Sequence, residues 1–407
     1  MPVFNPPELE RRFDTVRTWL ENLEVEVEFD DVTGALDVHG ASDVTVVPPA
    51  CIDESITVTM HDLLATVDEF APKKRFSFDG LVYQHGTTAV VRLQPLDAAA
   101  FRILEEPDAL TPQAAVLSDR TEVKVGLVRS SLSFVLATIV EDFFFADEYP
   151  LLGSYDAYAA INSARALTKD EILDVCHAYL FELGVSAKLM FEPAARLRDE
   201  ERQNDVDVDE LFDRAEHLRP LLVGVGLGPL LREYQRGVST VSPEIQVLCF
   251  VKCAEYVSAT VVRAEQYAEL RKRLTSSDAL SPNAQFMDGL LALCDENRTM
   301  KDEAALKLTI ERCCDAPLLA DLAPTFLSNL RGVRDAKAKA DPRQALGELA
   351  GCLSATRNQI AHAKANYRAT GRECPNDQLE ALAKCSRVVA EQCIRWYGLQ
   401  NPELRRA

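Results

Sequence analysis

From Ser354 to Ala363 the chain reads SATRNQIAHA, and this stretch tells more about the molecule than any other. It contains Arg357, Asn358 directly after it, and His362 five positions after the arginine, which makes an Arg-x4-His pattern. Arginine carries a permanently charged fork that binds phosphate, and histidine can take up and return a proton near neutral pH. These side chains are sufficient, in principle, for cleavage of RNA without a metal.

The pattern lies on a predicted helix that starts at Asp341-Pro342. At about 100° per residue, one apolar stripe of this helix holds Leu346, Leu349, Leu353 and Ile360. Arg357 falls at the edge of the stripe, whereas Asn358 and His362 fall on the opposite face. Because an arginine and a histidine five positions apart point in different directions on an unbroken helix, we expect a site where two such helices meet.

The region 242–407 reads as a helical bundle. Ser242-Pro243-Glu244 combines a capping serine, a proline at the first helical position and an acid in the first turn. A helix running to about Leu270 should follow it. Further helical patterns cover 282–295, 300–313, 318–332, 342–364 and 377–397, and Gly398 is a candidate C-cap.

The region 1–128 predicts a β-rich domain after an opening helix from Glu8 to Leu23. Period-two alternation of apolar and polar residues predicts antiparallel strands at 25–29, 43–47, 56–59, 75–78 and 123–127. The region 129–241 reads as mostly helical, with segments near 132–145, 169–193 and 207–217. The fold class expected for the whole chain is therefore α+β, with a β-rich N-terminal domain, a helical middle region and a C-terminal all-α bundle.

The net charge of −20 argues against a general nucleic-acid binder, but it is unevenly distributed. Residues 331–407 carry 14 Lys and Arg against 8 Asp and Glu, whereas the remaining residues carry 30 against 56. This asymmetry suits a small phosphate-binding site on an otherwise repelling molecule.

Other features of the chain exclude several classes of function. The 11 cysteines include no CxxC pair, and the 6 histidines form no cluster in sequence, so we expect reduced cysteines, no metal site and no cofactor. No secretory signal is visible and no apolar run approaches the length that spans a bilayer, which together predict a cytoplasmic protein without a membrane partner. The glycine string at 224–228 follows no predicted strand, so we interpret it as a turn or a helix contact.

The string from Arg357 to Ala363, near the end of an all-helical region and followed by one more amphipathic helix, resembles the signature of the HEPN superfamily. The resemblance covers about 242–398. It implies a helical bundle that is often a ribonuclease, with a composite active site at a homodimer interface. It also implies that His362 transfers the proton at the 2′-hydroxyl or leaving oxygen, that Arg357 neutralises the phosphate, and that Asn358 orients His362 or binds a phosphate oxygen.

Further roles follow from the same resemblance. Glu255 matches an acidic residue that some family members place on the first long helix, facing the motif; a plain surface charge is the alternative. The residues Lys364, Tyr367, Arg368 and Arg372 follow the motif and could bind RNA by charge and stacking, or form a solvated loop. The expected reaction yields a 2′,3′-cyclic phosphate, so DNA should resist cleavage.

Three functions remain open on the sequence. The leading one is an RNA endonuclease that the acidic N-terminal region regulates through a protein or small-molecule trigger, in antiviral defence or a toxin-like system; this setting rests on family analogy. The second is a non-catalytic HEPN interaction or scaffold protein that dimerises through the same helices. The third is a nucleotidyl- or phosphate-transfer enzyme that uses the glycine string and binds ATP.

Overall fold

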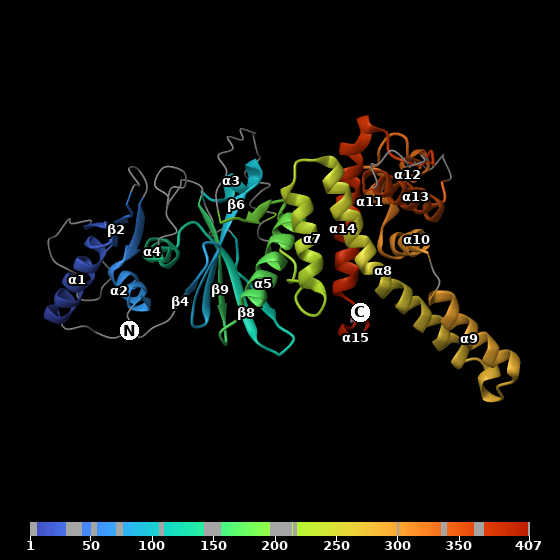
Figure 1. Ribbon diagram of the computed structural model, residues 1–407, viewed down its shortest axis with the longest axis horizontal. Coiled ribbons are helices and arrows are strands. Elements are labelled where there is room, and N and C mark those ends of the chain that lie inside the picture. Colours follow the sequence, from blue (N-terminus) through green and yellow to red (C-terminus); the bar gives the residue numbers. More distant parts are fainter. Residues whose placement is uncertain are drawn as a thin grey trace. The chain divides into compact units, whose positions relative to one another are not determined.

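The computed structural model describes residues 6–29, 43–49, 55–70, 76–105, 110–141, 156–195, 214, 218–298, 301–334, 340–361 and 370–405. Two compact units divide the chain, Met1–Leu221 and Leu222–Ala407. The first unit holds the described β-strands, and the second is helical throughout its described elements (Figure 1). The predicted α+β class is confirmed.

A small antiparallel sheet opens the first unit. Its strands are β1 (Glu26–Phe29), β2 (Asp43–Val47) and β3 (Ile56–Thr59), in the order β1-β2-β3. On β2, Val44 and Val46 are buried while Asp43 is exposed, which is the predicted alternation. The buried valines form a core with apolar residues of three helices, α1 (Pro6–Glu21), α2 (Met60–Glu69) and α4 (Leu132–Val140).

A larger antiparallel sheet completes the first unit. Its strands are β4 (Phe76–Phe78), β5 (Val82–His85), β6 (Thr88–Pro95), β7 (Gln113–Val116), β8 (Glu122–Val128), β9 (Ala157–Ser163) and β10 (Phe191–Pro193). The order is β4-β5-β6-β9-β8-β7, and β10 pairs with the far end of β6. All but the first residue of β6 are buried, because helix α5 (Lys169–Glu182) packs on one face and Phe134 of α4 joins Tyr83 and Tyr158 in a second cluster. The unit also contains α3 (Ala98–Ile103) and a π-helical turn, η2 (Leu183–Ala187).

The regional division expected from sequence differs from the one observed. The boundary placed after residue 128 falls inside the large sheet, because β8 pairs directly with β9. Strands β9 and β10 lie within the region read as mostly helical, where α4 and α5 do match the predicted segments. The predicted segment at 207–217 lies outside the described residues apart from Arg214.

The second unit is a helical bundle built around one long helix, α8 (Pro243–Leu274). The side chain of Ser242 caps it, accepting from the Ile245 N–H at 3.5 Å, and Pro243 occupies the first turn, as predicted. Helix α8 packs against α7 (Leu227–Ser239), α10 (Asp302–Cys313), α13 (Pro342–Ala361) and α14 (Leu379–Gly398). The remaining elements are η3 (Ser277–Leu280), α9 (Ala284–Arg298), α11 (Ala316–Ala320), α12 (Ser328–Gly332), η4 (Asn376–Gln378) and α15 (Pro402–Arg405).

Most of the predicted helices of this unit are confirmed, with two corrections. The segment 318–332 is broken into α11 and α12, because Pro324 lacks an N–H and its carbonyl instead closes a turn with the Leu327 N–H. Gly398 is the last residue of α14 and Leu399 is the C-cap. A Cβ on Gly398 would lie 2.9 Å from Leu222 Cδ2, so the glycine lies at a close side-chain contact and is not the C-cap.

The glycine string at 224–228 is a turn that begins α7, as predicted. Gly226 has φ of 80° and is the N-cap of that helix. A Cβ on it would lie 2.2 Å from the Tyr397 hydroxyl oxygen, so this glycine satisfies both a left-handed backbone and a close contact. Its role is in packing the bundle.

One expectation about apolar runs was wrong. Among the described residues, α8 is long and apolar enough to cross a membrane by length and composition. In the bundle, 56% of its most apolar window is buried. A helix in the core of a folded domain can be equally long and apolar, because it contacts apolar neighbours on several sides.

Candidate functional site

Helix α13 positions the Arg-x4-His string through its buried apolar stripe. Leu346, Leu349 and Leu353 are buried as predicted, and they fix the rotation of the helix in the bundle. Ile360, expected in the same stripe, is only half-buried. It lines a pocket of about 580 Å³ together with residues at the starts of α8 and α14. That pocket contains three carboxylates, on Glu244, Asp377 and Glu380, so it disfavours a phosphate.

Arg357 is paired with Glu255 of α8. Its Nη2 lies 3.3 Å from Glu255 Oε2, and this contact joins residues that are 102 positions apart in the chain. The side chains are 36% and 28% exposed respectively, so the pair sits partly sunk between the two helices. The structure thus brings Glu255 to the motif arginine, as the family resemblance had implied, and Glu255 is more than a plain surface charge.

Asn358 holds the same guanidinium from a second side. Arg357 Nη1 donates to Asn358 Oδ1 at 2.9 Å. A guanidinium has five N–H groups, so the two contacts fix its direction and leave further donors for a phosphate oxygen. Asn358 therefore acts on Arg357 in this arrangement, whereas the sequence had grouped it with His362.

Burial raises the pKa of the Glu255 carboxyl. The Arg357 charge opposes this rise, and the nearby Asp302 at the start of α10 adds to it. Lys252, one turn earlier on α8, also acts on Glu255 and favours its charged form. Sequence reasoning missed both neighbours: the spacing from Lys252 to Glu255 was a usable signal, whereas Asp302 arrives through the tertiary fold.

Arg372 pairs with Glu303 of α10 and passes Gly351 of α13. Its Nη1 lies 2.5 Å from Glu303 Oε1, and a Cβ placed on Gly351 would lie 3.2 Å from the same nitrogen. The segment that carries it is held to the motif helix, because the Cys374 N–H donates to Thr356 Oγ1 at 2.8 Å. The Arg372 side chain thus lies over Gly351 in the middle of α13. Its segment is held by Thr356, the residue directly before Arg357.

The other predicted site residues lie outside the described part of the chain. They are His362, Lys364, Tyr367 and Arg368. His362 directly follows Ala361 in the sequence. Ala361 is the last residue of α13 and lies one helical turn beyond Arg357. The described site therefore consists of Glu255, Arg357 and Asn358, with the charges of Lys252 and Asp302 beside it.

No metal cluster accompanies this arrangement: the described residues contain no group of three or more His, Cys, Asp or Glu side chains that could hold an ion. Comparison of the chain with protein-family models, with curated proteins and with solved structures finds no match.

Proposed function

We propose that the protein is a metal-independent RNA endonuclease of HEPN type, with Arg357, Asn358 and His362 at its active site. The observation that carries the proposal is the Glu255–Arg357–Asn358 contact at the start of the Arg-x4-His string. It presents a fixed guanidinium, only 36% exposed, five positions before His362 in the sequence. A phosphate-binding charge that is held in place in advance stabilises a phosphorane-like transition state without reorganisation.

The reaction follows from these side chains. The ribose 2′-oxygen attacks the adjacent phosphorus, the bond to the 5′-oxygen breaks, and a 2′,3′-cyclic phosphate and a 5′-hydroxyl result. His362 takes the proton of the 2′-hydroxyl or supplies one to the leaving oxygen. Arg357 neutralises the phosphate as its charge builds up. Glu255 and Asn358 orient Arg357, so they are positioning residues.

The first test compares wild type with His362→Ala on RNA and on DNA of the same sequence, in EDTA. The proposal predicts that wild type cleaves RNA only and that the variant loses cleavage while its thermal unfolding is unchanged. DNA cleavage, or full activity in His362→Ala, would refute the proposed reaction.

The non-catalytic interaction protein remains the second candidate, because one surface of the bundle favours it. Helix α9 packs against the C-terminal half of α8 (Figure 1). These two helices and η3 between them carry exposed apolar side chains, namely Tyr267, Leu274, Leu280, Met287 and Leu291. Exposed apolar clusters commonly mark interaction surfaces. This candidate predicts no RNA cleavage at any protein concentration, and a dimer that Leu291→Glu weakens in light scattering.

The first unit is proposed to regulate the nuclease in response to a protein or small-molecule trigger, in a defence or toxin-like setting. Its core contains a buried ion pair, Arg92 Nη2 to Asp156 Oδ1 at 3.0 Å, which also binds the Tyr158 hydroxyl. Replacing Asp156 by Ala would leave Arg92 buried without its carboxylate and cost about 3–5 kcal/mol. Loosening this unit should change the rate of RNA cleavage; an unchanged rate would contradict regulation.

A further inference from the structure

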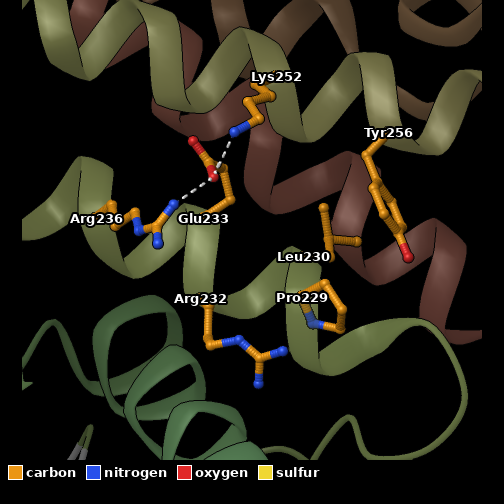
Figure 2. Close-up of a pocket in the computed structure, with 7 residues that line it drawn as sticks. All are labelled: Pro229, Leu230, Arg232, Glu233, Arg236, Lys252 and Tyr256. Carbon is orange, nitrogen blue, oxygen red and sulfur yellow. Dashed lines mark hydrogen bonds and ion pairs between the residues drawn. The ribbon is translucent and has the colours of Figure 1, made fainter.

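A pocket of about 320 Å³ lies between α7 and α8, and Lys252 is the residue it shares with the site described above. Its lining residues are Pro229, Leu230, Arg232, Glu233, Arg236, Lys252 and Tyr256. The volume is at the lower end of the range of small-molecule sites, roughly 300–1,000 Å³. Figure 2 shows that charged groups gather at one end of the pocket and an aromatic ring stands at the other.

The charged end is built on Glu233. Lys252 Nζ lies 2.9 Å and Arg236 Nη1 3.3 Å from Glu233 Oε2. The glutamate side chain is 14% exposed, whereas those of Lys252 and Arg236 are 62% and 71% exposed. The carboxylate thus ties together two cations that face outward, and the cluster keeps a net positive charge on a chain of net charge −20. Such a cluster attracts an anion.

The apolar end is built on Tyr256. Its ring is 42% exposed, and it meets the buried Tyr397 ring at a centroid distance of 5.9 Å and an angle of 71°. This edge-to-face contact holds the ring in place. Leu230 and Pro229 lie between the ring and the cations (Figure 2). A flat, partly apolar group would be bound here by stacking.

Phosphate next to a planar ring is the chemistry of a nucleotide. The pocket also borders the proposed active site, because its Lys252 is one helical turn from Glu255 on α8 and its charge acts on the Glu255 carboxyl. We propose that this pocket binds one nucleotide of the RNA substrate, beside the scissile phosphate, with its phosphate on Arg236 and Lys252 and its base on Tyr256. The inference rests on the proposed function and names the substrate-binding residues of the same site.

Binding can be measured separately from cleavage. The probe is a short fluorescein-labelled RNA with 2′-O-methyl riboses, which lacks the attacking 2′-hydroxyl, and the readout is anisotropy. Tyr256→Leu should weaken binding by about 5- to 100-fold, the loss expected for one base stack, and Tyr256→Phe should retain it. The matched control is Tyr267→Leu, which removes an exposed tyrosine farther along α8 and should not change binding.

The charged end is tested by salt dependence. Arg236→Gln should lower the slope of log affinity against log salt by about 0.7, the change expected for one phosphate contact with single-stranded RNA. Lys272→Gln, which changes a lysine paired with Glu269 at 3.7 Å near the far end of α8, should leave the slope unchanged.

Several outcomes would overturn the assignment. One is Tyr256→Leu binding RNA as tightly as wild type. Another is Tyr256-dependent binding of AMP without binding of the RNA probe, which would make the pocket a site for a free nucleotide. If no protein cleaves RNA but Tyr256-dependent RNA binding persists, the pocket stands and the nuclease proposal falls. If Arg357-dependent cleavage occurs but Tyr256→Leu leaves RNA binding unchanged, the nuclease proposal stands and the pocket assignment falls.

Discussion

Helix α13 carries two Arg–Glu ion pairs that differ in their surroundings. Arg343 lies 3.1 Å from Glu311 of α10 and is 78% exposed, while Arg357 lies 3.3 Å from Glu255 of α8 and is 36% exposed. Glu311 is also approached by Lys307, a second cation, whereas Glu255 is near the like charge of Asp302. Glu311 is itself only 11% exposed, but it keeps Lys307 when Arg343 is removed, so the exposed Arg343 contributes little to stability. In the second pair, burial and Asp302 disfavour the charge on Glu255 while Arg357 favours it, a combination often found at functional sites.

The largest expected difference between the two pairs is in RNA cleavage. Arg357→Ala should lower the cleavage rate by about 100- to 1,000-fold, the cost of removing one preorganised donor to a developing oxyanion. Arg343→Ala should leave the rate unchanged and alter the free energy of unfolding by at most about 1 kcal/mol. Equal losses of activity in the two variants would abolish the distinction.

A stability measurement distinguishes the role of the ion pairs from that of the buried residues that hold α13 in the bundle. Leu353 comes between Arg343 and Arg357 in the sequence of α13, and it is completely buried. Leu353→Ala should lower the free energy of unfolding by about 2–5 kcal/mol, because it removes apolar contacts and leaves a cavity. Arg357→Ala should unfold close to wild type in urea. A large destabilisation by Arg357→Ala would mean that its pair is structural.

A smaller effect on the cleavage rate is expected from the hydrogen bond between Arg357 and Asn358. Asn358→Ala removes the acceptor of the Arg357 Nη1 hydrogen bond and should lower the cleavage rate by about 10-fold, the effect of one hydrogen bond to a charged group. Because the role is positioning, the loss should fall on kcat more than on KM. Asn358→Asp keeps the acceptor oxygen and should restore most of the rate.

The smallest effect is on the pH dependence of stability. Since the pKa of Glu255 is raised by burial, the folded state binds its proton more tightly than the unfolded state, and this residue adds stability as pH falls from neutral through the ordinary range of glutamate. Relative to Glu255→Gln, the melting temperature of wild type should therefore rise as pH falls.

An exposed glutamate gives the opposite sign. The hydrogen bond from Lys384 lowers the pKa of Glu380, so its contribution is present at neutral pH and is lost as pH falls. Relative to Glu380→Gln, the melting temperature of wild type should fall with pH. The same sign for both residues would contradict the surroundings described for Glu255.

The helical unit was predictable because its signals are local. A proline and a capping residue mark the start of α8, and a period of 3.6 marks the buried face of α13, so the helices were placed within a few residues. The break between α11 and α12 depends on a single proline within an otherwise helical pattern.

The β-rich unit was predicted only in part. Strands β2 and β3 alternate clearly and were placed without error, because one face of their sheet is buried. Most of β6 is buried on both faces, so its residues show no alternation, and β9 follows a helix and joins the sheet through long-range pairing. Such pairing leaves no local pattern in the sequence.

For the site, the motif and an acidic residue facing it were expected from sequence, whereas the atoms that join them were not. Arg357 and Asn358 were identified from the string, and Glu255 only from the family resemblance. The direction of the Arg357 side chain, the approach of Asp302 and the pocket at Tyr256 depend on how α7, α8, α10 and α13 pack, which side-chain spacing along one helix does not specify.

The most direct test of the account is the chemistry of the RNA ends produced in EDTA by wild type, Arg357→Ala and Arg343→Ala. The account predicts fragments with 2′,3′-cyclic phosphate and 5′-hydroxyl ends from wild type and Arg343→Ala, and intact RNA with Arg357→Ala. Fragments with 3′-hydroxyl ends, or the same fragments from Arg357→Ala at the wild-type rate, would contradict it.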